Sequence, residues 1–102
     1  MKKDIWWLVE DDENRGGYNM AFDDYFARNI GNRPLLRFFR WNPYCLSLGY
    51  GQESSVFSPF LLRENNIDIV RRPTGGRAVL HADEVTYSII IPDSHPLFKL
   101  TT

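Results

Sequence analysis

Cysteine and histidine are scarce in this sequence, and their scarcity excludes whole classes of protein. Of 102 residues, one is a cysteine, Cys45, and two are histidines. A single cysteine excludes an internal disulfide and predicts a cytoplasmic protein, because reducing compartments leave thiols unpaired. His81 and His95 together with one cysteine match no metal-ligand spacing, so no metal site is expected.

Long apolar runs and an excess of one charge are also missing. No apolar run approaches the roughly 18 residues that a membrane span needs, so no membrane span is expected. The short apolar run near the N-terminus meets the acidic residues 10–13 at once, which does not suit a signal peptide. The net charge of −1 gives no reason to expect general binding to nucleic acid or to anionic membranes.

Aromatic residues, by contrast, are abundant. They make up 15% of the chain, within 43% hydrophobic and 25% charged residues. This composition is ordinary for a soluble globular protein, and the length suits one domain. The large rings are expected to fill much of the core or to line a pocket.

The pattern along the chain predicts an α+β fold with a mixed, mostly antiparallel sheet and flanking helices. Helices are expected at residues 19–30, capped by Asn19, and at residues 60–64, where Ser58 and Pro59 form a cap and first turn. The aromatic side chains of the first helix are expected to form its buried face. Strands are expected at residues 5–9, 35–41, 45–49, 67–72, 78–81 and 85–91, with hairpins between the late ones. Residues 95–102 resemble the start of another element, so residues 1–102 are predicted to form only part of a domain.

The segment Arg71–His81 concentrates the residues best suited to binding. Arg71 and Arg72 carry planar, paired donors for a carboxylate or phosphate. Gly75 and Gly76 allow backbone amides to approach a ligand closely. His81 can donate a hydrogen bond or titrate near neutral pH. The alternative interpretation, a solvated strand end followed by a hairpin loop, stays open on these residues alone.

A second segment, residues 41–52, places small side chains on one face of a strand. Cys45, Ser47 and Gly49 alternate with Leu46 and Leu48. The small face can form a pocket floor or a tight crossing between strands. Cys45 has no acid or base beside it in the sequence, so a buried core position is expected rather than a nucleophile. Asp23 and Asp24 are neighbours on a helix and do not form an acid/base pair.

Three blocks of sequence resemble the lipoate-protein ligase A and octanoyltransferase family. The first runs from Gly17 through Asn19, Met20 and Ala21 to Asp23. The second contains Trp41-Asn42-Pro43, Leu46-Ser47-Leu48-Gly49 and Gln52. The third, Arg71-Arg72-Pro73-Thr74-Gly75-Gly76-Arg77-Ala78-Val79-Leu80-His81, is similar to the family signature of paired arginines, glycines and a histidine. The blocks occur in family order and span nearly the whole chain.

The resemblance implies the biotin/lipoate protein ligase fold, of which this chain resembles the N-terminal part. Residues 1–102 are then expected to form a single partial acyl-binding domain. It implies transfer of an octanoyl or lipoyl group to a lysine of a carrier domain, such as the glycine cleavage H protein or the lipoyl domain of a 2-oxoacid dehydrogenase. Acyl carrier protein is the implied donor for octanoyltransferases, and ATP with magnesium is implied only for the ligase type. No covalently bound cofactor is implied. The expected substrate-binding residues are Ser47, Gly49, Arg71, Arg72, Thr74, Gly75, Gly76, Arg77, His81 and Tyr87.

Two departures from the family pattern qualify these expectations. Arg77 stands where many adenylating ligases have a third glycine, which favours an octanoyltransferase-like protein over an ATP-dependent ligase. The family's lysine, and its nucleophilic cysteine where present, correspond to positions beyond this chain, so no catalytic residue is expected within it. The enzyme is therefore predicted to be incomplete when alone and to need a second chain or further residues. The alternative is a non-catalytic acyl-binding or regulatory module.

Overall fold

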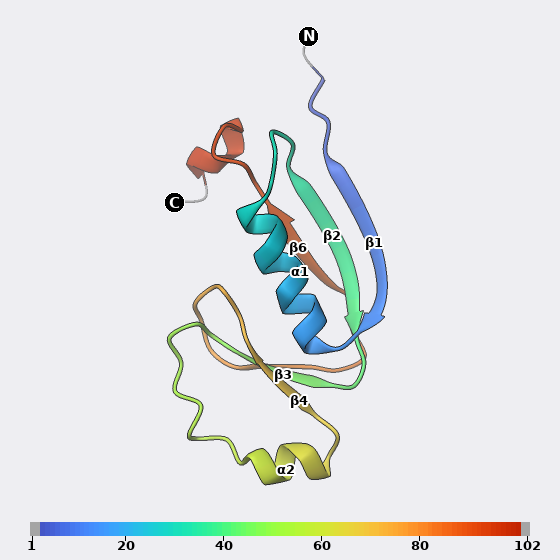
Figure 1. Ribbon diagram of the computed structural model, residues 1–102, viewed down its shortest axis with the longest axis vertical. Coiled ribbons are helices and arrows are strands. Elements are labelled where there is room, and N and C mark those ends of the chain that lie inside the picture. The colour runs from blue at the N-terminus through green and yellow to red at the C-terminus, as the bar shows by residue number, and fades with distance from the viewer. Residues whose placement is uncertain (1–2, 101–102) are drawn as a thin grey trace.

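The strands of this chain form two small sheets that lie one above the other along the long axis (Figure 1). The computed structural model describes residues 3–100, except for the side chain of Leu100. The predicted order of strands and helices is confirmed, with a 3₁₀ turn η1 added at its end. The elements are β1 (Trp7–Asn14), α1 (Gly16–Arg28), β2 (Leu35–Trp41), β3 (Cys45–Leu48), α2 (Pro59–Glu64), β4 (Asp68–Arg71), β5 (Val79–His81), β6 (Thr86–Ile90) and η1 (Pro96–Leu100).

Each sheet has three strands, with one parallel and one antiparallel pair. The first has the order β1-β2-β6, in which β1 runs parallel and β6 antiparallel to β2. The second has the order β4-β3-β5, in which β4 runs parallel and β5 antiparallel to β3. The α+β class is thus confirmed. The prediction of hairpins between the late strands is wrong. Strands β4 and β5 do not pair with each other, because both pair with β3, and β5 and β6 belong to different sheets.

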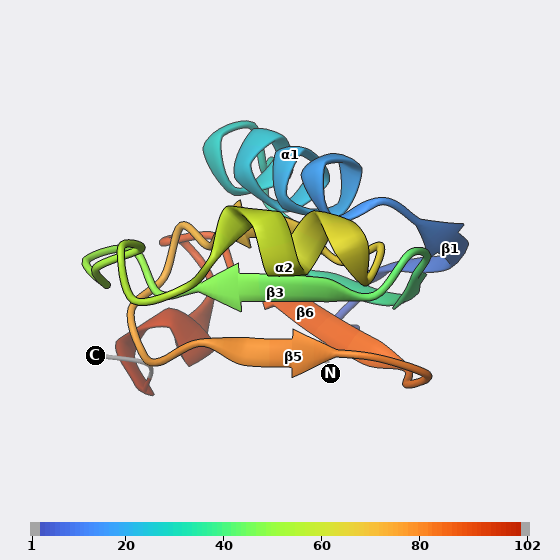
Figure 2. The ribbon, with the colours of Figure 1, turned by 90° about the horizontal axis from the view of Figure 1, so that it is seen from below.

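The core lies where the two sheets and α1 meet. Along β2 the side chains of Leu35, Arg37, Phe39 and Trp41 are buried, while those between them are more exposed. Phe39 and Trp41 pack with Cys45 of β3, and Met20 of α1 covers them. Period-two alternation therefore decides which face of β2 meets the helix, and α1 lies across that face (Figures 1 and 2).

Helix α1 begins three residues earlier than predicted, and its buried face differs from the expected one. Gly16 forms the first turn, and a glycine is needed there because a Cβ would lie 2.4 Å from the sulfur of Cys45. Asn19, predicted as the cap, is fully buried inside the helix, and Arg15 takes the cap position without a side-chain hydrogen bond. Tyr18 and Tyr25 are largely exposed, so the aromatic face is only partly buried.

Strand β1 extends through the acidic segment that was predicted to end it. Its pairing with β2 runs from Trp7 to Asn14, with an irregularity between Glu10 and Glu13. Charged residues are well tolerated on such an edge strand, since its outer side faces water. Asp11 is the exception, because its carboxylate contacts a buried arginine of β2.

The second helix is confirmed as predicted. Ser58 caps α2 by accepting a hydrogen bond from the amide of Leu61 at 3.2 Å, and Pro59 occupies the first turn. Helix α2 packs against β4 at the far end of the molecule from the two chain termini (Figure 1). Within residues 3–100, no helix has the length and apolar character needed to cross a membrane.

Candidate functional site

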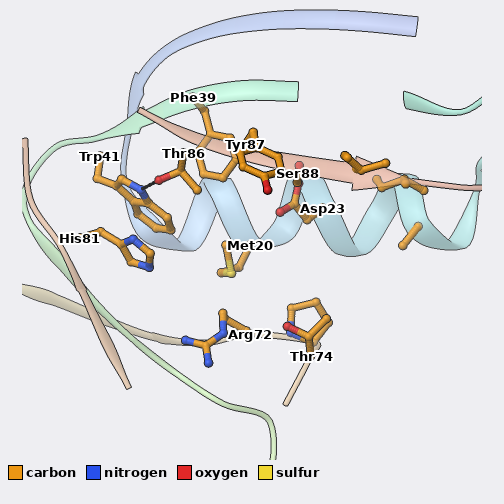
Figure 3. Close-up of a pocket in the computed structure, with 14 residues that line it drawn as sticks. Met20, Asp23, Phe39, Trp41, Arg72, Thr74, His81, Thr86, Tyr87 and Ser88 are labelled. Atoms are coloured by element: carbon orange, nitrogen blue, oxygen red, sulfur yellow. Dashed lines mark hydrogen bonds between the residues drawn. The ribbon is translucent and has the colours of Figure 1, made fainter. Parts of the chain in front are cut away.

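A pocket of about 290 Å³ opens between α1, the inner face of the first sheet and the loop that follows β4 (Figure 3). This volume lies at the lower end of the roughly 300–1,000 Å³ found for small-molecule sites. Arg72 and Thr74 lie across the pocket from Trp41, Thr86 and Ser88 (Figure 3). The lining residues are Met20, Asp23, Ala27, Phe39, Trp41, Arg72, Pro73, Thr74, His81, Thr86, Tyr87, Ser88, Ile89 and Ile90.

The walls are mostly apolar, with one carboxylate among them. Asp23 accepts hydrogen bonds from Ser88 at 3.0 Å and from Arg37 at 3.3 Å. Burial raises the pKa of Asp23, and the hydrogen bond from Ser88 and the charge of Arg37 offset this only in part. The pocket can therefore hold an apolar chain next to the fixed carboxylate of Asp23.

Arg37 lies behind the pocket wall and contacts Asp23, and it was not identified from the sequence. Its guanidinium is fully buried between the rings of Phe22 and Phe39, each 4.0 Å away. It donates to Asp11 at 3.1 Å and to the side chain of Asn19 at 2.7 Å. Within residues 3–100 its Nε has no hydrogen-bond partner. The available signal was a charged residue at a core position of an alternating strand, which requires buried partners.

Arg72 fixes the glycine-containing loop. One terminal nitrogen donates to the carbonyl of Ser47 at 2.9 Å and to its hydroxyl at 2.7 Å. The other donates to the carbonyls of Gly75 at 3.1 Å and Arg77 at 2.8 Å. Both terminal nitrogens of this guanidinium therefore bind the protein itself, so Arg72 shapes the loop that borders the pocket.

Arg71 has a corresponding role on the neighbouring loop. Its guanidinium donates to the carbonyls of Gly49, Tyr50 and Gln52 at 2.7–3.1 Å. This closes the turn after β3 and does not direct the side chain into the pocket. The paired arginines thus order two loops, and their binding of a ligand anion stays a prediction.

The glycines of the site differ in what they require. Gly76 has a φ of +101°, which disfavours any side chain. A Cβ on Gly49 would lie 1.8 Å from the carbonyl oxygen of Gly76, so the two backbones touch. Gly75 has open space around it. Of the two interpretations of the small-residue face, the close backbone contact applies at Gly49.

His81 lies at the pocket beside Trp41, and the two rings stack with centroids 4.0 Å apart. Its Nε2 is 2.8 Å from the hydroxyl of Ser47, and its Nδ1 is 3.2 Å from the carboxylate of Glu84. Glu84 also accepts hydrogen bonds from Thr86 at 2.8 Å and from the amide of Ala82 at 3.3 Å. Glu84 was not among the predicted site residues, because its link to the site through His81 depends on the folded structure.

Three other predicted residues lie at the margin. Thr74 lines the pocket, and its carbonyl accepts a hydrogen bond from the amide of Tyr50 at 2.8 Å. The side chain of Arg77 is exposed, and its carbonyl holds Arg72. Tyr87 borders the pocket, but it pairs with Phe38 on the outer face of β6 and is 64% exposed.

Cys45 is fully buried in the core, as predicted. Burial, together with the charge of Asp68, raises the pKa of its thiol to about 12. A thiolate is therefore scarce at neutral pH, and Cys45 does not meet the requirements for a nucleophile. Among the described residues, no group of three or more His, Cys, Asp or Glu side chains is arranged to hold a metal ion.

The α+β fold, with a pocket beside the glycine-containing loop, agrees with the fold that the sequence resemblance implies. The chain belongs to the family described as the lipoyl protein ligase A/B catalytic domain, which matches residues 15–101. The resemblance based on the three sequence blocks is thereby confirmed.

Several relatives in this family are octanoyltransferases. Octanoyltransferase LipM of Clostridioides difficile is 46% identical over 96 residues, which cover 90% of this chain and 35% of the relative. Octanoyltransferase LipM of Bacillus subtilis is 39% identical over 105 residues, covering 99% of this chain and 38% of the relative. The chain thus spans little more than a third of the length of these relatives.

Solved structures share the fold. Lipoate-protein ligase A bound with ATP superimposes with a TM-score of 0.78 at 25% identity, covering 93% of this chain and 40% of that one. A Thermoplasma acidophilum protein with bound lipoic acid gives 0.76 at 25% identity, with 93% and 42% covered. A bi-partite lipoate protein ligase of the same archaeon, studied with its E2 lipoyl domain, gives 0.71 at 25% identity, with 94% and 40% covered.

Proposed function

We propose that this chain forms the acyl-binding part of a protein-lipoylation enzyme that transfers an octanoyl group to a lysine of a lipoyl carrier domain. The observation that carries the proposal is the apolar pocket next to the ordered Arg72–Arg77 loop. An acyl chain fits such walls because its burial removes apolar surface from water. The loop amides at Gly75 and Gly76 offer donors to the carbonyl end of the chain.

An octanoyltransferase is favoured over an ATP-dependent ligase. The named relatives are octanoyltransferases at 35–46% identity, whereas the lipoate protein ligase structures are 25–29% identical. Arg77 replaces the third glycine of many adenylating ligases, which agrees with this choice. On this proposal the acyl donor is octanoyl-acyl carrier protein, and ATP with magnesium is not required.

The nucleophile and the lysine of the family lie outside this chain in the proposal. Cys45, the chain's one cysteine, is buried and has a strongly raised pKa. The binding half of the site would therefore come from these residues and the reacting groups from a further segment or a second chain. The bi-partite archaeal relative is a precedent for division into two parts. A reducing cytoplasm suits a protein with a single unpaired thiol.

Calorimetric titration of the 102-residue chain with octanoate tests the binding step. We expect saturable binding that weakens when a bulky side chain fills the pocket, as in Ala27→Trp on α1. Ala21→Trp is the matched control, because Ala21 is exposed on the same helix and does not line this pocket. Equal affinity in both variants would place the acyl group elsewhere.

A transfer assay separates the enzyme from the alternative, a non-catalytic acyl-binding or regulatory module. The chain is mixed with the remaining C-terminal segment of the Bacillus subtilis relative, octanoyl-acyl carrier protein and a lipoyl domain. We expect octanoylation of the lipoyl domain, detected by its mass, only when both parts are present. Binding of octanoate without transfer in any such mixture would favour the regulatory module.

A further inference from the structure

A continuous series of hydrogen bonds runs from the β5–β6 turn to residues 72–77, the glycine loop. It links the side chains of Glu84, His81, Ser47 and Arg72. The carboxylate of Glu84 contacts Nδ1 of His81 at 3.2 Å, and Nε2 of His81 contacts the Ser47 hydroxyl at 2.8 Å. That hydroxyl accepts from Arg72 at 2.7 Å. Arg72 in turn holds the carbonyls of Gly75 and Arg77. Residues from three separate parts of the sequence thereby converge on the loop.

When His81 is neutral, the direction of every hydrogen bond in this series follows from the chemistry of its ends. A guanidinium only donates, so the oxygen of Ser47 accepts from Arg72, and its single proton is available for Nε2 of His81. A carboxylate only accepts, so Nδ1 of His81 must carry the proton that faces Glu84. The opposite tautomer would direct a lone pair of Nδ1 at the carboxylate. Neutral His81 is therefore protonated on Nδ1.

The group resembles a serine, histidine and carboxylate arranged for nucleophilic attack, but its burial excludes that role. Ser47 is 0% exposed, and its oxygen already accepts a hydrogen bond from Arg72. A nucleophile needs an open path to the substrate. The same geometry instead transmits position, because each group fixes the orientation of the next.

We propose that Glu84 is a positioning residue that holds the glycine loop in its acyl-binding form through His81, Ser47 and Arg72. Glu84 suits this role because Thr86 and the amide of Ala82 hold its carboxylate in place. Thr86 is itself held by the indole of Trp41 at 2.7 Å (Figure 3). The role in acyl binding rests on the proposed function, whereas the ordering of the loop does not.

Nuclear magnetic resonance of the ¹⁵N-labelled 102-residue chain tests the hydrogen-bond directions without any variant at the site. The chain has two histidines, so His95→Gln assigns the imidazole signals. We expect neutral His81 to carry its proton on Nδ1. A proton on Nε2 would overturn the proposal even if every variant of Glu84 failed to fold.

Amide hydrogen exchange then measures the loop directly. The amide of Tyr50 reports on the loop, because it donates to the carbonyl of Thr74 at 2.8 Å. In Glu84→Ala we expect this amide to exchange about tenfold faster, the factor that corresponds to one lost hydrogen bond. Glu84→Gln keeps an acceptor oxygen for Nδ1 and should restore most of the protection. Asp83→Ala is the matched control, because it removes the same charge from the same turn at a side chain that is 90% exposed.

Titration with octanoate distinguishes failure of this inference from failure of the proposed function. We expect Glu84→Ala to lower octanoate affinity about tenfold in parallel with the loss of loop protection, and Asp83→Ala to leave it unchanged. Wild-type exchange rates in Glu84→Ala would refute the positioning role, whatever the affinity. Loss of loop protection in a chain that never binds octanoate would uphold the ordering of the loop and refute its acyl-binding purpose.

Discussion

Replacing Gly49 with alanine gives the sharpest test of how the glycine loop is held. The new Cβ would lie 1.8 Å from the carbonyl oxygen of Gly76, 2.7 Å from its carbonyl carbon and 3.0 Å from its nitrogen. All three atoms belong to the backbone, so no side-chain rotation relieves the clash. The loop must move away by more than 1 Å, since real Cβ atoms essentially never come within 3.0 Å of such atoms.

The size of the effect follows from the contacts that this movement disturbs. Overpacking of a tight contact costs about 1–3 kcal/mol. The hydrogen bond from the amide of Tyr50 to the carbonyl of Thr74 spans the same two loops at 2.8 Å and adds about 1 kcal/mol if lost. We therefore expect Gly49→Ala to lower the free energy of unfolding by about 2–4 kcal/mol. Urea denaturation followed by tryptophan fluorescence should show a lower midpoint with an unchanged slope.

Gly51→Ala is the matched control in the same loop. Nothing lies within 4 Å of a Cβ at Gly51, and its φ is not in the left-handed region. We expect its free energy of unfolding to stay within about 0.5 kcal/mol of wild type. If Gly49→Ala and Gly51→Ala were equally stable, the close contact between Gly49 and Gly76 would not exist in solution.

Three further outcomes are expected. Gly75→Ala should leave the urea midpoint unchanged, because nothing lies within 4 Å of a Cβ there. It should lower octanoate affinity about tenfold in calorimetry, because the methyl group would keep the acyl carbonyl from the loop amide and so prevent one hydrogen bond; unchanged affinity would exclude the loop from the site. Cys45 should resist alkylation by iodoacetamide at about pH 8 in the folded chain and react in urea, since burial raises its pKa to about 12; rapid native labelling would contradict its burial. Burial raises the pKa of Glu84, but hydrogen bonds from Thr86 and His81 more than offset it and leave it lowered. The ionised Glu84 carboxylate therefore stabilises the fold at pH values above its ordinary pKa of 4.5, and this stabilisation is lost as the pH falls through the lowered pKa. The stability difference between wild type and Glu84→Gln, measured in urea, should therefore narrow on acidification, and a constant difference would refute this.

The elements themselves were largely predictable, because their signals are local. Ser58 and Pro59 marked the start of α2, and alternation identified β2 within its observed bounds. The errors occurred where a distant contact outweighed a local preference. Helix α1 starts at Gly16, where it approaches Cys45 too closely for any side chain. Asn19 lies inside the helix and not at its cap, and its side chain accepts a hydrogen bond from the buried Arg37.

The sequence by itself determined the order of the elements, the family and the segment that borders the pocket. Short-range propensities and a motif of fixed spacing suffice for these. Only the tertiary structure decided which groups each residue of that segment contacts. Arg71 and Arg72 bind carbonyls of their own chain, and Glu84 reaches Ser47 through His81. These partners lie up to 34 residues apart in the Ser47–His81 pair. A pattern of neighbouring residues does not specify such contacts, because they depend on how the strands pair and which side chains they bury.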